Sequence, residues 1–534
     1  MNKNLHESNL SLLKNKNVLI IIPELANYMY YIYLLSIIEY AALNNATINV
    51  TLSKHIKVGI FQKARFGFTW RKYWSARRIF INYIEKNYNI RTLNNYEKRI
   101  NTLINFSSFK KKIGNSSKDI LSFSNEYKLL NNSLHSSFVT DMANSADSNY
   151  PTKKYKKRLY EYYLDFENSY NVIQNITAGE TIDLVIFFNG RATIQAGVRE
   201  FCEGKELQWL SLEHGSVPGK KFRLDPYQDQ ERIRNQNNYS NFLRQCTIAQ
   251  KLELSTMGES WLVAQENERS QNYFIREKIE SELYLEKIPR PFVNIFTSSV
   301  DENISSAGWD DEDLQGFINK TVQLSTKLKS EGIEPVIIMH PNSLNKSWRD
   351  LSLQLENYKK HNILTISPWA QISSYDFFRK AYLNITWRST LGLEISGNGL
   401  PCFVFGDTFY DLLTDVKRID FENLNKFVFE KWKVDSSKSL EYIGYLYNYG
   451  IECSFSNSNI LNSNNLIKSL EKHIPLGSKM ISVKNKLRIL KPLINPSKST
   501  PANLLNLLSK LLGRKIAIKL IRIVSSCVSA FLNR

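Results

Sequence analysis

The stretch YLNITWRSTLGLEISG, residues 382–397, combines a short apolar strand, a polar turn and a helix. Residues 382–386 are predicted to form a strand buried on both faces, and residues 391–397 a helix. The turn between them carries Arg388, Ser389 and Thr390. A strand that leads through a short polar turn into a helix is the repeating unit of an α/β fold with a parallel sheet.

Similar units surround this stretch in the second half of the chain. Short apolar runs predict strands there, and the segments between them predict helices. The strands are at 292–296, 335–339, 363–366 and 402–405, and the helices are at 311–330 and 373–380. This alternation predicts a parallel sheet covered by helices on both faces.

The first half begins in the same way. The run VLIII at 18–22 predicts a buried strand, followed by a helix at 27–43 and a strand at 47–52. The pattern returns with a strand at 183–188, a helix at 193–203 and a strand at 208–212. No glycine-rich dinucleotide fingerprint follows the first strand, so an NAD site is not predicted.

These patterns predict an α/β protein with two Rossmann-like parallel-sheet domains that face a cleft. We assign residues 1–285 to the N-terminal domain, with a helical, partly mobile insertion at about 62–170, and residues 286–453 to the C-terminal domain. Residues 454–534 are a linker and a basic tail. Apolar residues at near-helical spacing in 504–532, with lysines and arginines between them, suit an anionic membrane surface. The alternative is a helix packed on the body of the protein.

The charge balance favours anionic partners. The chain has 70 lysines and arginines against 51 aspartates and glutamates, a formal net charge of +19. Nucleic acid, an acidic membrane and phosphorylated substrates would each suit this charge. The segment 63–78 is basic and aromatic, but no zinc-finger, helix-turn-helix or RNP-type pattern accompanies it, so we expect no nucleic-acid partner.

The cysteines and the apolar runs indicate in which cellular compartment the protein is found. The five cysteines are odd in number and lack CxxC spacing, which indicates buried thiols in a reducing compartment. The apolar run at 25–38 is shorter than the roughly 20 residues that span a bilayer, and no signal peptide is recognisable. We therefore expect a cytoplasmic protein, peripherally associated with the inner face of the cell membrane.

Polar residues follow the predicted strands, and ligands of open α/β sheets bind outside the carboxyl ends of strands. In the first half these residues are Asn189, Arg191, Glu213 and His214. In the second half they are Ser298, Ser299, Asp301, His340, Arg388, Ser389, Thr390, Gly392 and Glu394. We expect the two groups to line two strand-end faces.

The RSTLGLE segment is typical of a phosphate-binding turn. The hydroxyls of Ser389 and Thr390 and the free N–H groups of the next helix suit a phosphate, and Gly392 permits close approach. Glu394 can accept from sugar hydroxyls, although an ordinary helix cap with an acidic first turn explains the same residues. His340 ends a strand, where an imidazole can donate to a phosphate or transfer a proton; a structural histidine is the plainer interpretation.

Several carboxylates, a histidine and two arginines are candidates for catalysing the transfer of a group to a hydroxyl. Glu213, His214 and Asp301 are candidates for taking a proton from an incoming hydroxyl or for stabilising a positive centre, and solvated loops or helix caps are the alternative. Arg191 and Arg388 can hold a phosphate or an acidic sugar, or can pair with these carboxylates. No DxD pattern follows a strand, so we expect no metal and no cofactor.

The ordered motifs FNGR, LEHG, FTSSVDE, MHPN, TWRSTLGLE and GLPCFVFGDTFY resemble those of capsule and surface polysaccharide biosynthesis proteins, a family related to Kdo-transferase-like GT-B glycosyltransferases. The resemblance covers about residues 180–415. It implies a GT-B fold whose second half binds the nucleotide-sugar donor. The QPED-type motif of the capsule Kdo transferases is absent, so the resemblance does not make CMP-Kdo the donor.

The residues and the resemblance together assign three groups of site residues. The donor-binding group is Ser298, Ser299, His340, Arg388, Ser389, Thr390, Gly392 and Glu394; the acceptor-side group is Asn189 and Arg191; the catalytic candidates are Glu213, His214 and Asp301. We expect a metal-independent, hexosyl- or Kdo-type glycosyltransferase that moves a sugar from a nucleotide sugar to a capsule- or lipopolysaccharide-type acceptor, which is a glycan or is lipid-linked.

Two alternatives stay open. A teichoic-acid-type polyol-phosphate transferase that uses a CDP-polyol would also have a His-Pro loop and a Ser-rich loop. A non-enzymatic membrane or RNA binding protein would use the segment 63–78 and the tail.

Overall fold

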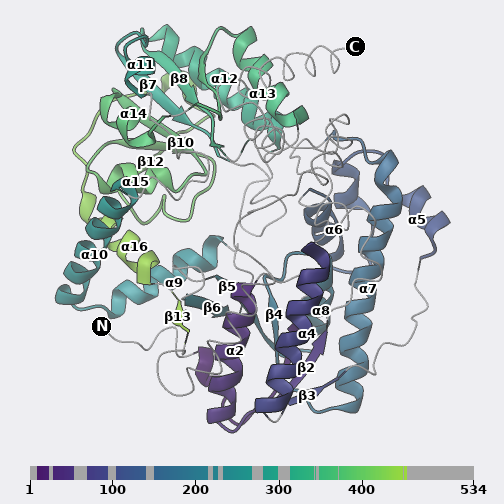
Figure 1. Ribbon diagram of the computed structural model, residues 1–534. Coiled ribbons are helices and arrows are strands. Elements are labelled where there is room, and N and C mark those ends of the chain that lie inside the picture. Colours follow the sequence, from purple (N-terminus) through teal and green to yellow (C-terminus); the bar gives the residue numbers. More distant parts are fainter. Residues whose placement is uncertain are drawn as a thin grey trace, which may run out of the picture. The chain divides into compact units, whose positions relative to one another are not determined.

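The computed structural model describes residues 9–22, 28–52, 69–88, 90–93, 104–139, 149–214, 221–226, 232–267, 281–298, 313–341, 343, 348–370, 372–448 and 450–453. They form two compact units, each built on one sheet (Figure 1). The first unit comprises the residues up to 137, those from 151 to 231, and the return of the chain from 448. The second comprises 138–150 and 232–447. The predicted linker and tail, 454–534, lie outside the described residues.

The first unit has a seven-stranded sheet in the order β13-β6-β5-β4-β1-β2-β3. The parallel strands are β1 (Asn17–Ile22), β2 (Thr47–Leu52), β3 (Ile90–Thr92), β4 (Leu184–Phe188) and β5 (Gln208–His214). β6 (Lys221–Asp225) and β13 (Ile451–Glu452) extend one edge through antiparallel pairings. Because β4 pairs with β1, the direction in which strands are added reverses at that pair.

Helices cover both faces of this sheet. α2 (Tyr28–Leu43) and α4 (Thr69–Asn87) pack on the face that carries Val18, Ile20 and Ile22. α7 (Lys156–Gly179) and α8 (Thr193–Gly204) pack on the opposite face, which carries Leu19 and Ile21. Alternate residues of β1 thus enter two different cores, which is why the VLIII run has no polar position.

The extent of the predicted insertion at 62–170 differs in the structure. α4 and β3 belong to the sheet unit itself, and α7 is the helix that returns the chain to β4. The added elements lie between β3 and α7, and they include α5 (Phe106–Lys112) and α6 (Leu130–Phe138). β3 was missed because its three residues, IRT, form an edge strand without an apolar run.

The second unit has a six-stranded, wholly parallel sheet in the order β12-β11-β10-β7-β8-β9. Its strands are β7 (Phe292–Phe296), β8 (Glu334–Ile338), β9 (Leu364–Ile366), β10 (Leu383–Trp387), β11 (Cys402–Phe405) and β12 (Lys417–Arg418). Counted from the first strand of each unit, both sheets have the strand order 3-2-1-4-5-6, and β13 adds a seventh strand beyond β6 in the first sheet. This doubly wound order confirms the prediction of two Rossmann-like units.

Helices again lie on both sides. α12 (Leu314–Ser330) and α13 (Trp348–Lys360) pack on the face that carries Val293 and Ile295. α14 (Ser374–Lys380) and α15 (Leu391–Gly397) follow the other face, where the alternate strand residues Asn294 and Asn384 are buried. The Asn294 Nδ2 donates to Phe377 O and to Asn384 Oδ1, both at 3.0 Å, and Asn384 Nδ2 donates to Phe378 O at 3.0 Å. The pair therefore satisfies carbonyls of α14 that are turned towards the sheet.

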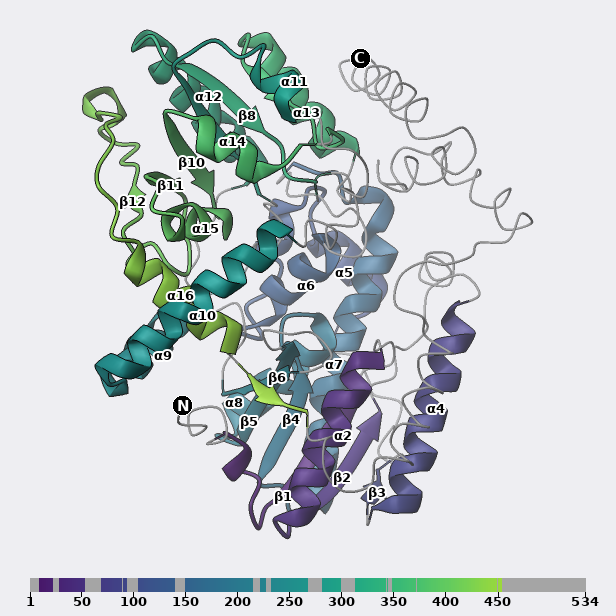
Figure 2. The same ribbon diagram turned by 60° about the vertical axis from the view of Figure 1, so that its left-hand side comes forward.

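The second unit starts at Arg232 and not at the predicted residue 286. α9 (Arg232–Gln245) and α10 (Ile248–Asn267) belong to it, together with the short α11 (Ser281–Leu285). α10 crosses α16 (Ser436–Asn448) with the two backbones in contact (Figure 2). A Cβ added at Gly258 would lie 2.2 Å from Leu440 O, and one at Gly444 would lie 2.0 Å from Leu254 O. Only glycine permits such a crossing, so these helices pack as one body.

No helix in the described ranges is both long enough and apolar enough to cross a membrane.

We predict that Asn384→Ala destabilises the protein by about 2–3 kcal/mol, because it removes the Asn384 donor from the buried Phe378 carbonyl and one of the two acceptors of the buried Asn294 amide. The free energy of unfolding in urea measures this loss. The matched control is Asn319→Ala on α12, where the exposed Asn319 side chain accepts from Gln315 Nε2 and should cost less than about 0.5 kcal/mol. Equal losses in the two variants would contradict the role of the buried pair.

Candidate functional site

The reversal of the second sheet lies between β7 and β10, and the predicted donor-side residues gather at its carboxyl edge. Ser298 follows β7, His340 follows β8, and Arg388, Ser389 and Thr390 follow β10. Ligands of doubly wound sheets bind at this position. The structure therefore brings the described members of the predicted donor set to one sheet edge.

Thr297 ties two of these strand ends together. Its backbone N–H donates to Ile338 O at 3.1 Å, and its Oγ1 accepts from the His340 backbone N–H at 3.0 Å. Thr297 is buried, whereas Ser298 and His340 are partly exposed. The buried hydroxyl thus holds the His-Pro turn beside the end of β7. The sequence placed Thr297 on this strand end, but its role as a tie depends on the register of β7 and β8.

The turn after β10 is organised by its own hydrogen bonds. Ser389 Oγ accepts from the Leu391 N–H at 3.2 Å, and Ser389 O accepts from the Gly392 N–H at 3.2 Å and from the Tyr410 hydroxyl. The prediction that free N–H groups of this helix hold a phosphate is therefore not met for Leu391 and Gly392. Thr390, in contrast, is exposed. A ligand at this turn can be bound by the Thr390 side chain more readily than by the first N–H groups of α15.

Gly392 and Glu394 face the protein's own side chains. A Cβ added at Gly392 would lie 2.4 Å from the Tyr410 hydroxyl and 2.7 Å from Thr386 Oγ1, so the close approach that glycine permits here is to the core. Glu394 Oε2 accepts from the Tyr375 hydroxyl at 2.7 Å. Burial raises the pKa of Glu394 to about 7, and the Tyr375 hydrogen bond opposes this change. Near neutral pH this carboxyl can therefore either donate or accept.

A charged cluster that we did not predict surrounds Arg388. Its guanidinium lies 4.7 Å from the centre of the Trp387 ring, and burial lowers the pKa of Arg388 to about 10 although the charge of Asp407 opposes this. Asp407 and Asp411 pair with Arg232 of α9 at 3.4 and 3.6 Å and with Arg418 of β12 at 2.8 and 3.1 Å. Three arginines around two aspartates leave this edge positive. No local pattern indicated this cluster, because α9, β11 and β12 meet only in the folded unit.

The carboxyl edge of the first sheet carries a buried carboxylate. β5 extends to His214, so Glu213 and His214 lie on a strand and not in a loop. Glu213 Oε2 accepts from Asn189 Nδ2 at 2.8 Å, and Asn189 has φ 57° directly after β4. Burial raises the pKa of Glu213, and the hydrogen bonds from Asn189 and from the His214 N–H oppose the rise. Asn189 thus orients a carboxyl that is poised to take a proton.

His214 is held by α2 through both ring nitrogens. The Tyr30 hydroxyl lies 2.8 Å from Nε2, and the Tyr33 hydroxyl lies 2.8 Å from Nδ1. Burial, together with the charge of Arg223, lowers the pKa of His214. We predicted the helix at 27–43 as a core helix, and the sequence did not indicate that it would contribute to the site.

Arg191 and the start of α8 are contacted by α6. Arg191 Nε donates to Ser136 Oγ, and Ser137 Oγ accepts from the Thr193 N–H at 3.2 Å. Burial and the charge of Arg191 lower the pKa of the neighbouring His135 to about 4, so this imidazole is neutral at physiological pH. The region predicted as an insertion therefore supplies the LHSSF segment to the turn after β4. No local motif indicated this, because α6 and β4 are far apart in sequence.

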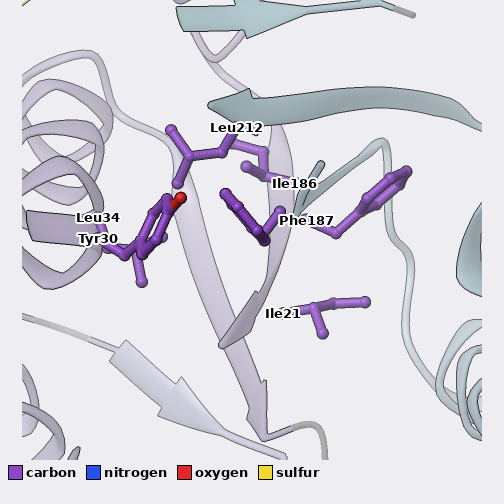
Figure 3. Close-up of a pocket in the computed structure, with 7 residues that line it drawn as sticks. Ile21, Tyr30, Leu34, Ile186, Phe187 and Leu212 are labelled. Carbon is purple, nitrogen blue, oxygen red and sulfur yellow. The ribbon is translucent and has the colours of Figure 1, made fainter. Parts of the chain in front are cut away.

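A narrow apolar gap lies beneath these strand ends. Figure 3 shows Tyr30 and Leu34 of α2 opposite Ile186 and Leu212 of β4 and β5. The gap is too narrow to admit a water molecule. It is a packing defect between helix and sheet and not a substrate pocket.

Two predicted residues, Ser299 and Asp301, lie outside the described residues. Within the ranges that the structure describes, no three His, Cys, Asp or Glu side chains come together as metal ligands. Metal-independent catalysis stays a prediction.

The sequence matches no protein-family model and no curated protein. Among solved structures, it is similar to Thermosulfurimonas dismutans KpsC, a beta Kdo 2,4 transferase, with 16% identity, TM-score 0.34, and coverage of 54% of this chain and 88% of that one. It is also similar to Methanocaldococcus jannaschii UDP-GlcNAc 2-epimerase in complex with UDP-GlcNAc and UDP, with 12% identity, TM-score 0.25, and coverage of 80% and 98%. The wall teichoic acid polymerase TagF matches with 12% identity, TM-score 0.20, and coverage of 89% and 95%. With TM-scores below 0.5, these likenesses assign neither donor nor reaction, and the sheet topology itself establishes the two Rossmann-like units.

We predict that Glu394→Gln flattens the dependence of stability on pH. The folded state binds the Glu394 proton more tightly than the unfolded state, so this group stabilises the fold below about pH 4.5 and loses that effect as the pH rises through 7. The loss in the wild type amounts to roughly 3 kcal/mol. Urea titrations at about ten pH values between 4 and 8 give the free energy of unfolding at each pH and so measure this loss.

The control for this prediction is Glu331→Gln, which changes an exposed carboxylate that pairs with Lys327 at 2.8 Å. Its pH dependence should follow the wild type. Parallel curves for the wild type and Glu394→Gln would show that Glu394 is not an acid with a raised pKa.

Proposed function

We propose that the chain is a glycosyltransferase that transfers a sugar from a nucleotide-sugar donor to a hydroxyl group of a surface-polysaccharide acceptor. The observation that carries the proposal is the gathering of Ser298, His340, Thr390 and Glu394 at the ends of strands β7, β8 and β10, where the second sheet reverses. The first unit has the same strand order and carries the buried carboxyl of Glu213 at the corresponding edge.

The second unit would bind the donor. The exposed hydroxyl of Thr390, the hydroxyl of Ser298 and the imidazole of His340 offer hydrogen bonds to phosphate oxygens. The charged cluster has three arginines, Arg388, Arg232 and Arg418, and only two aspartates. It therefore adds a positive electrostatic potential at the same edge. Glu394 Oε2 accepts from the Tyr375 hydroxyl, so this partly exposed carboxyl, with its pKa near 7, would hydrogen-bond to a ribose or sugar hydroxyl through Oε1.

The first unit would activate the acceptor. We assign the base to Glu213 and not to His214, because both His214 ring nitrogens already have tyrosine partners, whereas each carboxylate oxygen of Glu213 has a second lone pair besides its bond to Asn189 or to the His214 N–H. Glu213 would take the proton of the acceptor hydroxyl while the acceptor oxygen forms a bond to the anomeric carbon. The bond from that carbon to the phosphate oxygen would break, and the nucleotide would leave with the electron pair. A raised carboxyl pKa brings the base closer to the operating pH.

The setting of the reaction is part of the proposal. The motif order between residues 180 and 415 supports a capsule- or lipopolysaccharide-type acceptor, and the net charge of +19 supports work at the anionic cytoplasmic face of a membrane. A polyol-phosphate transferase would use the same strand-end groups, so the nature of the bound nucleotide distinguishes the two.

We expect calorimetry to detect selective binding of one nucleotide or nucleotide sugar among the CMP, CDP, UDP, GDP and dTDP series. His340→Ala and Thr390→Ala should each weaken it by roughly tenfold, because each removes a hydrogen bond to a charged phosphate. The matched controls are His361→Ala and Thr326→Ala, which alter exposed side chains bonded to their own helices, α13 and α12. Turnover of a CDP-polyol would instead select the polyol-phosphate transferase. No binding by any of these nucleotides would reject both enzymes.

We expect Glu213→Gln to reduce sugar transfer by roughly 10²–10⁴-fold while nucleotide binding persists, because the amide cannot accept a proton. Radiolabelled transfer to cell-envelope acceptor measures the rate, and calorimetry measures the binding. The control is Glu167→Gln, which changes a buried carboxylate on α7 that also accepts from a tyrosine hydroxyl, that of Tyr163. Full transfer by Glu213→Gln would remove Glu213 from catalysis.

A further inference from the structure

Lysines are concentrated in the elements that the chain adds between β3 and α7 and in the start of α7 itself. Segments 106–122 and 151–157 together contain eight lysines and one acidic residue, Asp119. The carboxylate of Asp119 accepts from two backbone N–H groups of its own turn, at 2.8 and 2.9 Å. Lys156 is partly exposed, and the other seven lysines are exposed: Lys110, Lys111, Lys112, Lys118, Lys153, Lys154 and Lys157. We refer to these eight lysines as the basic surface.

The two segments lie side by side, so the eight lysines share one surface. Lys156 Nζ donates to Lys110 O at 3.0 Å, and the Thr152 N–H donates to Asn115 O at 2.9 Å. Beneath these contacts, the buried ring of Phe109 packs against two tyrosine rings of α7, with centroids 5.3 and 5.6 Å away. Figure 1 shows α5 on the side of α7 that is turned away from β4.

Helix stability explains some of these lysines and not others. Residues 110–112 form the last turn of α5, where positive charge is favourable beside the helix carbonyls. Lysines within 153–157 instead precede and open α7, a helix of 24 residues that has no acidic residue in its first turn. Positive charge at a helix N-terminus opposes the helix dipole. The fold therefore gains nothing from these lysines, and an anionic partner outside the protein accounts for them.

The basic surface lies beyond the carboxyl edge of the first sheet. α7 and α8 lead to the amino ends of β4 and β5, so they run in the same direction. Where they touch, a Cβ added at Gly197 of α8 would lie 2.3 Å from Phe166 O of α7. Ten residues of α7 precede Phe166 and four residues of α8 precede Gly197, so α7 begins about 9 Å further out than α8. Because α8 begins at the turn that carries Asn189, the basic surface is at the same end of the unit as Glu213.

The side chains of this surface fit a phospholipid membrane better than a nucleic acid. The two segments contain no arginine, the residue best suited to paired hydrogen bonds with nucleic-acid phosphates. Phe106 and Leu121, on the same elements, are 40% and 42% exposed. Phe106 precedes Lys110 by one turn, so the two share a face of α5. Lysines next to exposed apolar side chains are typical of proteins that lie on anionic membranes.

We propose that the basic surface docks the first unit on an anionic phospholipid membrane, with the carboxyl edge of its sheet turned towards the lipid headgroups. The lysines attract the surface to the membrane, and Phe106 and Leu121 enter the interface. A lipid-linked acceptor would then reach Glu213 without leaving the bilayer. Only this last step rests on the proposed function, because docking needs neither a donor nor an acceptor.

Sedimentation of the full-length protein with vesicles tests the docking. We expect binding to vesicles of equal parts phosphatidylglycerol and phosphatidylcholine, and weaker binding to phosphatidylcholine alone or at about 1 M salt. Lys111→Gln with Lys112→Gln should weaken binding by roughly tenfold, and the further addition of Lys153→Gln and Lys154→Gln by roughly a hundredfold or more in all. The matched control neutralises two exposed lysines at the end of α13, Lys359→Gln with Lys360→Gln, and should bind like the wild type.

Phe106→Ser separates insertion from charge. It should weaken vesicle binding without changing its salt dependence, whereas Leu283→Ser, at an exposed leucine of α11, should have no effect. Thermal melting of each variant checks that the fold is retained. Wild-type vesicle binding by the four-lysine variant would overturn the proposal, and loss of its binding to a mixed-sequence single-stranded RNA in the same experiment would make nucleic acid the partner. If vesicle binding depends on the basic surface but no nucleotide binds, the proposed function fails and the docking surface stands.

Discussion

The reversal of strand order at the centre of each sheet is the constraint on which the rest of the structure depends. β1 pairs with β4 and β7 pairs with β10, so helices must cross both faces to connect parallel neighbours. With both faces covered, the strands can present polar groups only at their ends or where hydrogen bonds offset their burial. The strand-end turns diverge on either side of the reversal, and this is where Ser298 and Thr390 in one unit and Asn189 in the other come to lie.

Burying carboxyl groups at these edges has a cost, and the two units offset it in similar ways. Glu213 and Glu394 are both desolvated, which raises their pKa values, and hydrogen bonds from Asn189 and from Tyr375 oppose the rise. The elements that surround the strand ends therefore also set the protonation of these carboxyls. Fold stability and site chemistry are coupled through the same side chains.

The strands that could be predicted from the sequence are those in which nearly every residue is buried. β1 and β11 are buried on both faces, so their sequences, apart from Asn17 at the start of β1, are continuous apolar runs. β3, β12 and β13 have two or three residues and lie towards sheet edges, where one side is exposed and no apolar run is required. β6 alternates between buried and partly exposed positions, and it pairs antiparallel, which local patterning does not reveal.

By itself, the sequence determined the alternation of strands and helices, the doubly wound class of both units, and the polar residues that stand at strand ends. Those features depend on hydrophobic periodicity and turn chemistry within a few residues. Only the tertiary structure decided which side chains meet there. Tyr30 and His214 are 184 residues apart, and Gln236 and Asp411 are 175 apart. Their contacts follow from sheet register and helix packing, which long-range apolar burial fixes and which no local pattern encodes.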